Sequence, residues 1–457
     1  MKTAIILAAG SGTKIWPFAE VRPKAMIPVA NRPILWHHVE LLGGLGFDHI
    51  VIVGGSMAEQ IRHYFRNDRR VTVLQTQPNL GTAKSLHTAR PYVKDSAFLV
   101  LYGDTLLDRS DVEEMIARFE TGGQEAVALV DPLKEEQPQD WICCTLSEGK
   151  LDQIMGHPRR PFTHRFCAFA FADTFWPYAE TNSGLFTNVQ VGMMPPMEAF
   201  LEMSVADYIQ DGKEVPAVEV KGLFADLDKP WHILSANQRV AKLQCGCLTG
   251  HVLGEGSSIH PSAAIDGFVK MGKCSAIGRN VVIKGNVIVG DHTIIENGAI
   301  LGGNNIIGDH TYIGNYCQVS AGSVIGHKCI ISHCAEINGL TMDVVHLTHY
   351  MEFYGIIGSH TDLGAATVCG TLRFDDRYAM HRVKGRREYP KEHANATFMG
   401  DYARTGVNAV LMPGCKVGVN SIVGSGVILE EDLPNRTSIY QKQELVRREW
   451  GPEQYGW

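Results

Sequence analysis

Aliphatic residues recur at every sixth position through the C-terminal half of this 457-residue chain. Fifteen positions share one unbroken phase: Leu253, Ile259, Ile265, Met271, Ile277, Ile283, Val289, Ile295, Leu301, Ile307, Ile313, Val319, Ile325, Ile331 and Ile337. After breaks at 341–354 and 371–398 the series resumes, and it ends at Leu429. A period of six held this long is typical of a hexapeptide-repeat parallel β-helix, in which each coil stacks inward aliphatic side chains on the next. We therefore expect a β-helix domain over 251–434, with an insertion loop at 371–398.

Residues 1–232 follow another pattern, in which apolar runs alternate with helical periodicity. The runs at 3–9, 49–55, 71–75, 97–104 and 125–130 predict buried strands, and 33–46 and 111–120 have the spacing of packed helices. Such alternation predicts an α/β domain built on a Rossmann-like, mainly parallel sheet covered on both faces. We expect 233–250 to form a linker helix and 435–457 a C-terminal tail.

The composition narrows the class of protein. The chain is 45% hydrophobic and 20% charged, with a formal net charge of −7, which gives no reason to expect a nucleic-acid or membrane partner. Its eleven cysteines lack the spacing of a disulfide framework or a zinc site. No stretch reaches the length of about 18 apolar residues needed for a membrane span. We expect a cytoplasmic protein with reduced thiols.

The stretch "LAAGSGTK" at 7–14 follows the first expected strand and predicts a phosphate-binding turn. Gly10 and Gly12 allow close approach of the backbone, whose N–H groups can surround phosphate oxygens. Hydroxyls from Ser11 and Thr13 and charge from Lys14 and Lys24 would add to this cradle. The spacing matches neither a P-loop nor a dinucleotide-binding fingerprint, so a plain tight turn is the alternative.

These motifs resemble the signature of sugar-1-phosphate nucleotidylyltransferases, in which Leu-Ala-Ala-Gly is followed by a Pro-Lys pair, here Pro23-Lys24. Further similar segments follow in order: "QTQPNLGTAKS" at 75–85, "LYGDTLL" at 101–107 and "FADLDKPWHILSANQ" at 224–238. With the hexapeptide domain and "TLRFDD" at 371–376, the whole chain is similar to the bifunctional enzymes that make UDP-N-acetylglucosamine.

The resemblance implies attack of a sugar phosphate on a nucleoside triphosphate, with UTP favoured and GTP left open. The implied nucleotide-binding residues are Leu7, Ala8, Ala9, Gly10, Ser11, Gly12, Thr13, Gln75 or Gln77, Gly81, Thr82 and Gly103. Lys14 would stabilise the departing pyrophosphate, and Lys24 would neutralise the reacting phosphates. Asp104 and Asp226 would hold Mg²⁺, with Asp228 a close competitor for the second position.

For the second domain the resemblance implies a left-handed β-helix, a homotrimer and acyltransfer from acetyl-CoA. His346, in "VVHLTHYMEFYGIIG", would be the general base, the alternative being a surface or stacked histidine. The basic insertion carries Arg382, Lys384, Arg386 and Arg387, which could bind phosphates of acyl-CoA or of an acceptor. A solvated protrusion that stabilises the trimer is the other interpretation of this loop.

The expected sugar pocket departs from the family pattern. Relatives carry a Glu-Lys-Pro-like element and an Asn-x-Gly strand, whereas 151–173 reads "LDQIMGHPRRPFTHRFCAFAFAD", with Phe166-Cys167-Ala168 on the strand. We therefore keep two alternatives. One is transfer to a phosphorylated substrate that is not a sugar, such as a phosphorylated amino alcohol. The other is a regulatory protein that binds nucleotide without turnover.

Overall fold

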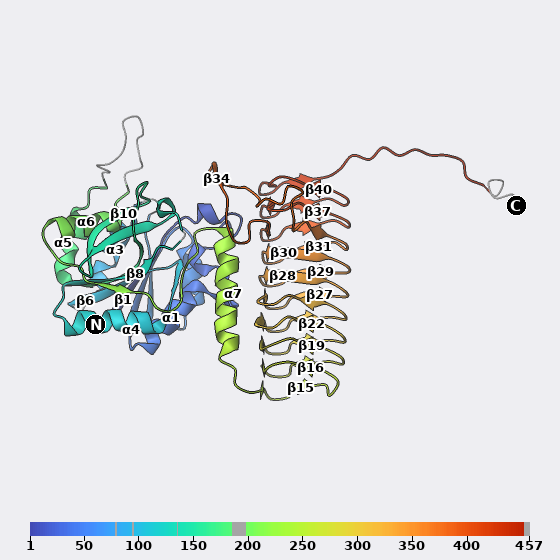
Figure 1. Cartoon of the computed structure of the whole chain (residues 1–457), viewed down its shortest axis with the longest axis horizontal. Coiled ribbons are helices and arrows are strands. Elements are labelled where there is room, and N and C mark those ends of the chain that lie inside the picture. Colours follow the sequence, from blue (N-terminus) through green and yellow to red (C-terminus); the bar gives the residue numbers. More distant parts are fainter. Residues whose placement is uncertain (78–79, 94–95, 135, 185–197, 452–457) are drawn as a thin grey trace.

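The computed structural model describes residues 1–77, 80–93, 96–134, 136–184 and 198–451. Figure 1 shows an α/β domain beside a column of stacked short strands, with helix α7 (Pro230–Gly246) standing between them. The C-terminal tail leaves the far end of the column in an extended conformation (Figure 1). Among the described residues, no helix is both long enough and apolar enough to cross a membrane.

The N-terminal domain is built on a mixed, mostly parallel sheet whose parallel part has the order β6-β1-β4-β5, with β5 at the edge. These strands are β1 (Thr3–Ala8), β4 (His49–Gly54), β5 (Val71–Gln75) and β6 (Ala97–Tyr102), and they pair in parallel as expected. The fifth expected strand is β8 (Ala126–Pro132). The prediction of a parallel α/β sheet is confirmed for this part of the domain.

Helices cover both faces of this sheet because successive strand residues point to opposite sides. Ile6 of β1 packs with α1 (Ile34–Gly44), α2 (Ala58–Tyr64) and α4 (Arg109–Thr121). Ile5, its neighbour, packs with α3 (Thr82–Ala89), α5 (Trp176–Thr181) and α6 (Leu201–Gln210). The strands are apolar throughout because both of their faces are buried.

An antiparallel extension, absent from the sequence-based expectation, widens the sheet. Strand β11 (His164–Ala172) pairs antiparallel with β6, β8 and β9, and β10 (Lys150–Gly156) pairs antiparallel with β9 (Ile142–Ser147). This extension carries the segment that departs from the family's sugar-binding pattern. Most of that segment therefore lies in the sheet, and residues 157–163 form the connection between β10 and β11.

The β-helix is confirmed over residues 252–439, all of which the structure describes. Short parallel strands form a 16-stranded and a 10-stranded sheet, from β14 (Val252–Leu253) to β41 (Ser438–Ile439). Ile259 pairs with Ile277, 18 residues further on, so three hexads make one coil. The aliphatic residues of the sixfold series, from Ile277 to Leu429, form one continuous buried core.

Helix α7 joins the two domains through a shared apolar core. It begins at Pro230, three residues before the expected start of the linker, and its residues Leu234 and Val240 pack with Ile34 of the first domain and Leu340 of the β-helix. The expected insertion contains a two-stranded hairpin, β33 (His381–Val383) and β34 (Arg386–Glu388). In Figure 1, β34 lies above α7, between the domains.

Candidate active site

A cavity of about 380 Å³ opens at the C-terminal ends of β1 and β6. The chain runs outward from β1 to β4 and β5 on one side, then returns to place β6 on the other. Ligands in open α/β sheets bind at such a reversal of strand order, outside the carboxyl ends of the strands. Leu7 and Asp104 stand on the two sides of this reversal, and both line the cavity.

The glycine-rich turn forms one wall of the cavity. Gly12 has a φ of +67°, and a Cβ atom there would lie 2.6 Å from the Cβ of Ala19, so the turn requires glycine at this position. A Cβ at Gly10 would meet nothing within 4 Å. Gly10 and Ser11 line the cavity, which leaves their backbone open to a ligand.

Two carboxylates converge because two short strands pair. Strand β7 (Thr105–Leu107) follows Asp104 directly, and it pairs antiparallel with β13 (Phe224–Asp226), which sets Asp226 opposite Thr105. The backbone N–H of Leu227 donates to the carbonyl oxygen of Asp104 at 2.9 Å. Asp104 and Asp226, 122 positions apart in the sequence, therefore line the same cavity.

Lysine side chains from the N-terminal segment pair with Asp104 and with the nearby Asp228. Lys24 Nζ lies 2.6 Å from Asp104 Oδ2 and 3.6 Å from Asp228 Oδ1. Lys14 Nζ lies 3.1 Å from Asp228 Oδ2. The structure thus brings together the two lysines and the aspartates that the sequence had suggested separately.

The protonation equilibria follow from burial and from these neighbours. Burial opposes the charge on Lys24, but attraction to Asp104, Asp228 and Asp226 outweighs it and raises the Lys24 pKa. Burial, and then the charge of Asp104, raises the pKa of Asp226 well above its usual range. Burial acts the same way on Asp228, but Lys24, Lys14 and Lys229 reverse it and lower the Asp228 pKa. Asp228 thus pairs with lysines, whereas Asp226 lies beside the charge of Asp104 and, among the described residues, forms no ion pair of its own.

The repulsion between Asp104 and Asp226 fits a site for a divalent cation, which would relieve it. No cluster of three or more His, Cys, Asp or Glu side chains arranged as a metal site occurs among the described residues. Mg²⁺ is commonly held by one or two carboxylates plus substrate phosphates, so two aspartates beside a phosphate-binding turn suit this ion.

Most of the expected nucleotide-binding residues lie on the cavity wall. Those that line it are Leu7, Ala9, Gly10, Ser11, Gln77, Gly81 and Thr82. Of the residues expected to act in catalysis or to hold the metal in this domain, Lys14, Asp104 and Asp226 line it and Lys24 does not. Of the two glutamines left open, Gln77 lines the cavity and Gln75 does not. Ala8, Gly12, Thr13 and Gly103 also lie outside the lining. For Gly103 the structure offers a packing reason, because a Cβ atom there would lie 2.8 Å from the Cβ of Ala8.

Sequence motifs had not identified Arg165 as a cavity residue. Its Nε donates to Asp131 Oδ2 at 2.6 Å, and its guanidinium lies over the rings of Trp141 and Phe224, at 5.0 and 4.7 Å from their centroids. The neighbouring Phe166 also lines the cavity and stacks on Phe169 with centroids 4.1 Å apart. The wall expected to contact a sugar is therefore aromatic, and its cation, Arg165, is held by Asp131.

Comparison with known proteins places the chain in a family. Residues 4–165 match the MobA-like NTP transferase domain. The bifunctional protein GlmU of Methanococcus maripaludis strain C7 is 33% identical over 455 residues, covering 97% of this chain and 98% of that protein. The chain belongs to the bifunctional GlmU family. GlmU of Methanocaldococcus jannaschii is 28% identical over 97% of this chain and 99% of its own length. A bifunctional sugar-1-phosphate nucleotidylyltransferase/acetyltransferase of Sulfurisphaera tokodaii is 26% identical over 94% and 98%.

Membership of the GlmU family makes this chain an enzyme with a nucleotidyltransferase domain and an acetyltransferase-type β-helix. The alternative of a nucleotide-binding protein without turnover is therefore set aside. The family resemblance inferred from the sequence motifs is confirmed along nearly the whole chain.

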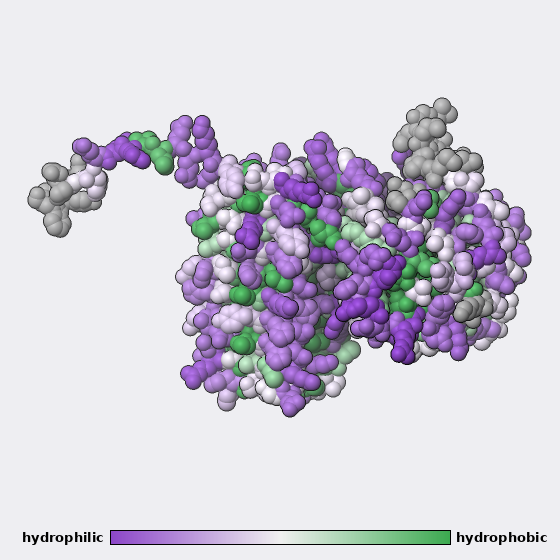
Figure 2. Space-filling model, turned by 180° about the vertical axis from the view of Figure 1, so that it is seen from behind, coloured by the Kyte–Doolittle hydropathy of each residue, from purple (hydrophilic) through white to green (hydrophobic). Residues whose placement is uncertain are grey.

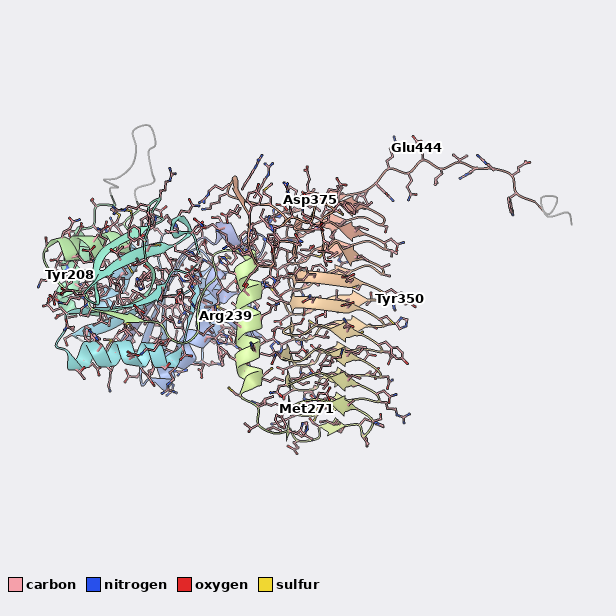
Figure 3. All side chains as sticks on the ribbon, in the orientation of Figure 1. Tyr208, Arg239, Met271, Tyr350, Asp375 and Glu444 are labelled. Atoms are coloured by element: carbon pink, nitrogen blue, oxygen red, sulfur yellow. The ribbon has the colours of Figure 1, made fainter. Side chains whose placement is uncertain are left out.

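The residues proposed for acyltransfer do not gather into one place within this GlmU-family chain. His346 is half-buried on β29 (His346–Thr348), stacked between Ile330 and Asp362 of the adjacent coils. Strand β29 lies on the side of the β-helix away from the first domain, as does Tyr350 shortly after it (Figures 1 and 3). The hairpin with Arg382, Lys384, Arg386 and Arg387 lies instead against the first domain, where Arg386 Nη2 is 3.7 Å from Asp140 Oδ1.

Proposed function

We propose that the N-terminal cavity joins a nucleoside triphosphate, with UTP favoured, to a sugar 1-phosphate. A phosphate oxygen of the sugar phosphate attacks the α-phosphorus. A new P–O bond forms, the bond to the β-phosphate oxygen breaks, and pyrophosphate leaves with that electron pair. This proposal rests on one observation above others: Lys14, Asp104 and Asp226 line a single cavity with the glycine-rich turn, and Lys24, outside the lining, pairs with Asp104.

Catalysis of this kind needs positioning and charge neutralisation more than covalent chemistry. The backbone at Gly10 and Ser11 would hold the triphosphate, and Gln77 and Thr82 would contact the base. Lys24 stays charged because its pKa is raised, so it can neutralise the reacting phosphates at neutral pH. Asp104 and Asp226 would hold Mg²⁺, which supplies further positive charge when bound.

A second substrate class is favoured by the aromatic wall. Phe166 replaces the polar strand residue of sugar-binding relatives, and its ring lies 5.4 Å from that of Tyr102. Such a surface binds the hydroxyl groups of a sugar weakly, because an apolar side chain offers them no hydrogen bond. We keep transfer to a phosphorylated non-sugar, such as a phosphorylated amino alcohol, as the alternative.

Both proposed substrate classes are tested by measuring the release of pyrophosphate with a panel of substrates. The purified chain with Mg²⁺ is given UTP, GTP, dTTP or CTP, each with sugar 1-phosphates or with phosphorylated amino alcohols. We expect turnover with UTP and at least one sugar 1-phosphate, and a loss of at least a hundredfold in kcat/KM in Lys24→Ala. Turnover only with non-sugar acceptors would support the alternative. No turnover with any pair would overturn both.

We further propose that the β-helix transfers an acyl group from acetyl-CoA, with His346 as general base. An imidazole with a pKa near neutrality can accept the proton of an attacking amine. His346→Ala should abolish acetyl-CoA-dependent acylation and leave pyrophosphate release unchanged, while His310→Ala, at an exposed corner, serves as the control. Equal acylation in His346→Ala would contradict this role.

We also propose a cytoplasmic homotrimer assembled through the β-helix. Outward-facing apolar side chains are exposed along its coils, including Ile294 at 43%, Ile330 at 38% and Ile428 at 60%. Figure 2 shows hydrophobic residues scattered over this surface among hydrophilic ones. Contact with further copies would bury them. Light scattering should give a mass about three times the chain's 50.3 kDa, and a monomer would contradict the proposal.

A further inference from the structure

The hairpin of the β-helix insertion ends in a tight turn that presents a lysine. Strands β33 and β34 pair antiparallel with Val383 opposite Arg386, leaving Lys384 and Gly385 as the two-residue loop. Both loop residues have positive φ, +48° and +78°, as a type I′ turn requires. Asparagine, aspartate or glycine is the usual residue at the first position, and a lysine there is uncommon. Uncommon backbone conformations of this kind cluster at functional sites.

The hairpin is held against the first domain by buried contacts on both strands. The side chain of Val383 is buried in the apolar core shared by the two domains. On β34, Glu388 Oε2 lies 2.7 Å from Nζ of Lys229, whose side chain is only 4% exposed. Arg386 adds its contact with Asp140, itself a residue of the cavity wall. The position of the turn is therefore fixed by the fold.

At this position Lys384 lines the nucleotidyltransferase cavity, although it belongs to the second domain. The other cavity lysine, Lys14, is neutralised by Asp228. Within the part of the chain that the structure describes, no carboxylate lies within ion-pair distance of Lys384. An unpaired ammonium group in a cavity that also contains Lys14 and the glycine-rich turn is suited to a ligand phosphate.

The hairpin is also in electrostatic contact with the phosphate end of the cavity. Lys229 Nζ lies 3.7 Å from Asp228 Oδ2 as well as 2.7 Å from Glu388. Asp228 in turn pairs with Lys14 and Lys24. The anchor of the hairpin and the lysines of the first domain therefore share one carboxylate, which couples the position of the hairpin to that of the phosphate-binding lysines.

We propose that Lys384 is a phosphate-binding residue of the nucleotidyltransferase site, supplied by the β-helix domain of the same chain. The inference rests on the proposed function of the cavity. The phosphate has two sources in that reaction: the pyrophosphate portion of the nucleotide, or the monoester of the second substrate. In either case the first active site is complete only when the hairpin is docked, so the β-helix contributes directly to the first reaction.

Steady-state kinetics of Lys384→Ala in the full chain test this proposal. We expect a rise of about tenfold or more in one KM, with kcat changed less than threefold, since a charge-assisted hydrogen bond is lost. A rise in KM for pyrophosphate, measured in the reverse direction, and for the triphosphate assigns the lysine to the leaving group. A rise for the phosphorylated acceptor alone assigns it to the second substrate.

Two further variants separate phosphate binding from a structural role. Lys384→Arg keeps the charge and should restore most of the affinity. Arg377→Ala removes an exposed cation elsewhere in the same insertion and should match the wild type. If every KM of Lys384→Ala stays within twofold of the wild type, the proposal is wrong. It is also wrong if all KM values rise equally while the melting temperature falls.

Calorimetric titration with magnesium pyrophosphate keeps this inference separate from the proposed function. Should the wild type release no pyrophosphate from any substrate pair, binding of pyrophosphate can still be compared between the wild type and Lys384→Ala. At least tenfold weaker binding in the variant would support the role of Lys384 as an anion ligand. The same comparison is made with a sugar 1-phosphate, and equal binding of both ligands by the two proteins, or binding of neither by the wild type, would overturn it.

Discussion

Individual side chains around the cavity are arranged for a charged ligand. Lys14 and Lys24 are oriented by aspartates before any ligand binds, so little side-chain ordering would be left to accompany phosphate binding. The aspartates differ in their partners and in their pKa values. Asp228 pairs with lysines, which lower its pKa, whereas Asp226 lies beside Asp104 and has a raised pKa. A divalent cation bound by Asp104 and Asp226 would remove that repulsion and would take the place of Lys24 on Asp104.

Glu202 on α6 gives a prediction on pH and stability. Burial raises the pKa of its carboxyl from 4.5 to about 7. The folded chain therefore retains a proton that the unfolded chain releases, and the free energy of unfolding falls as the pH rises from about 4.5 to about 7. We expect Glu202→Gln to raise the free energy of unfolding by about 3 kcal/mol at pH 8 and by little at pH 4.5.

Denaturant unfolding of both proteins at the two pH values measures this difference. Glu125→Gln, a change at a half-buried carboxylate paired with Lys213, serves as the control and should not stabilise the protein at pH 8. An equal effect of Glu202→Gln at pH 4.5 and pH 8 would show that the carboxyl of Glu202 does not titrate abnormally.

The residues of the candidate site that could be proposed from the sequence are those that belong to short motifs. Lys14 and Lys24 belong to the turn segment and Asp104 follows a strand, so their types and spacing were informative on their own. Arg165 was missed because its place depends on the antiparallel strand β11 and on packing against Trp141. Lys384 was noticed only as part of a basic loop, because no local pattern tells which domain a hairpin will contact.

Among the secondary-structure elements, α7 has the most specific connections. Asn237 is buried, and its Oδ1 accepts from the backbone N–H of Ala30 at 2.9 Å. Its amide nitrogen donates to the carbonyl oxygens of Ile233 and Pro28, at 2.9 and 3.2 Å. One side chain thus connects the helix to the segment that follows Lys24.

Removal of this side chain should loosen that connection. Asn237→Ala leaves the N–H of Ala30 buried without a partner, and we expect a loss of about 1–3 kcal/mol in the free energy of unfolding. Gln244→Ala, at an exposed position of the same helix, should change it by less than 0.5 kcal/mol, taking about that limit for surface substitutions. Equal effects of the two changes would contradict the assigned role of Asn237.

The period of six residues predicted the β-helix well because every coil places the same requirement on its inward-facing side chains. Every inward position must be aliphatic to stack on the coil below, so the signal accumulates along the chain. The hairpin of β9 and β10 was not predicted, since its strands mix polar and apolar residues. Strand β11 was expected only at Phe166-Cys167-Ala168, since its pairing with β6 and β8 is not visible in the local sequence. The hairpin in the insertion lies outside the repeat and was predicted only as a loop.

The molecule as a whole is held together by a shared core and a buried ion pair between its domains. Arg22, from the segment before Lys24, donates to the carboxylate of Asp401 in the β-helix, whose side chain is fully buried. The backbone N–H of Ser359 donates to the same carboxylate at 2.9 Å. The first domain is thereby fixed on the β-helix in a defined position.

Loss of Arg22 would leave Asp401 buried without a counter-charge. We expect Arg22→Ala to lower the free energy of unfolding by about 3–5 kcal/mol. Adding Asp401→Asn should recover part of this loss, because the uncompensated charge is then gone. Arg109→Ala breaks an exposed pair with Glu113 and should cost about 1 kcal/mol or less. If Arg22→Ala costs no more than Arg109→Ala, the ion pair does not fix the domains.

The binding of manganese together with nucleotide tests the central assignment, a carboxylate and phosphate site in the first domain. Electron paramagnetic resonance counts free and bound Mn²⁺ in the presence of UTP without requiring turnover. We expect nucleotide-dependent binding of Mn²⁺ to the wild type, and an affinity at least tenfold weaker when Asp104 and Asp226 are both changed to Asn. Undiminished binding in the double variant would contradict the assignment.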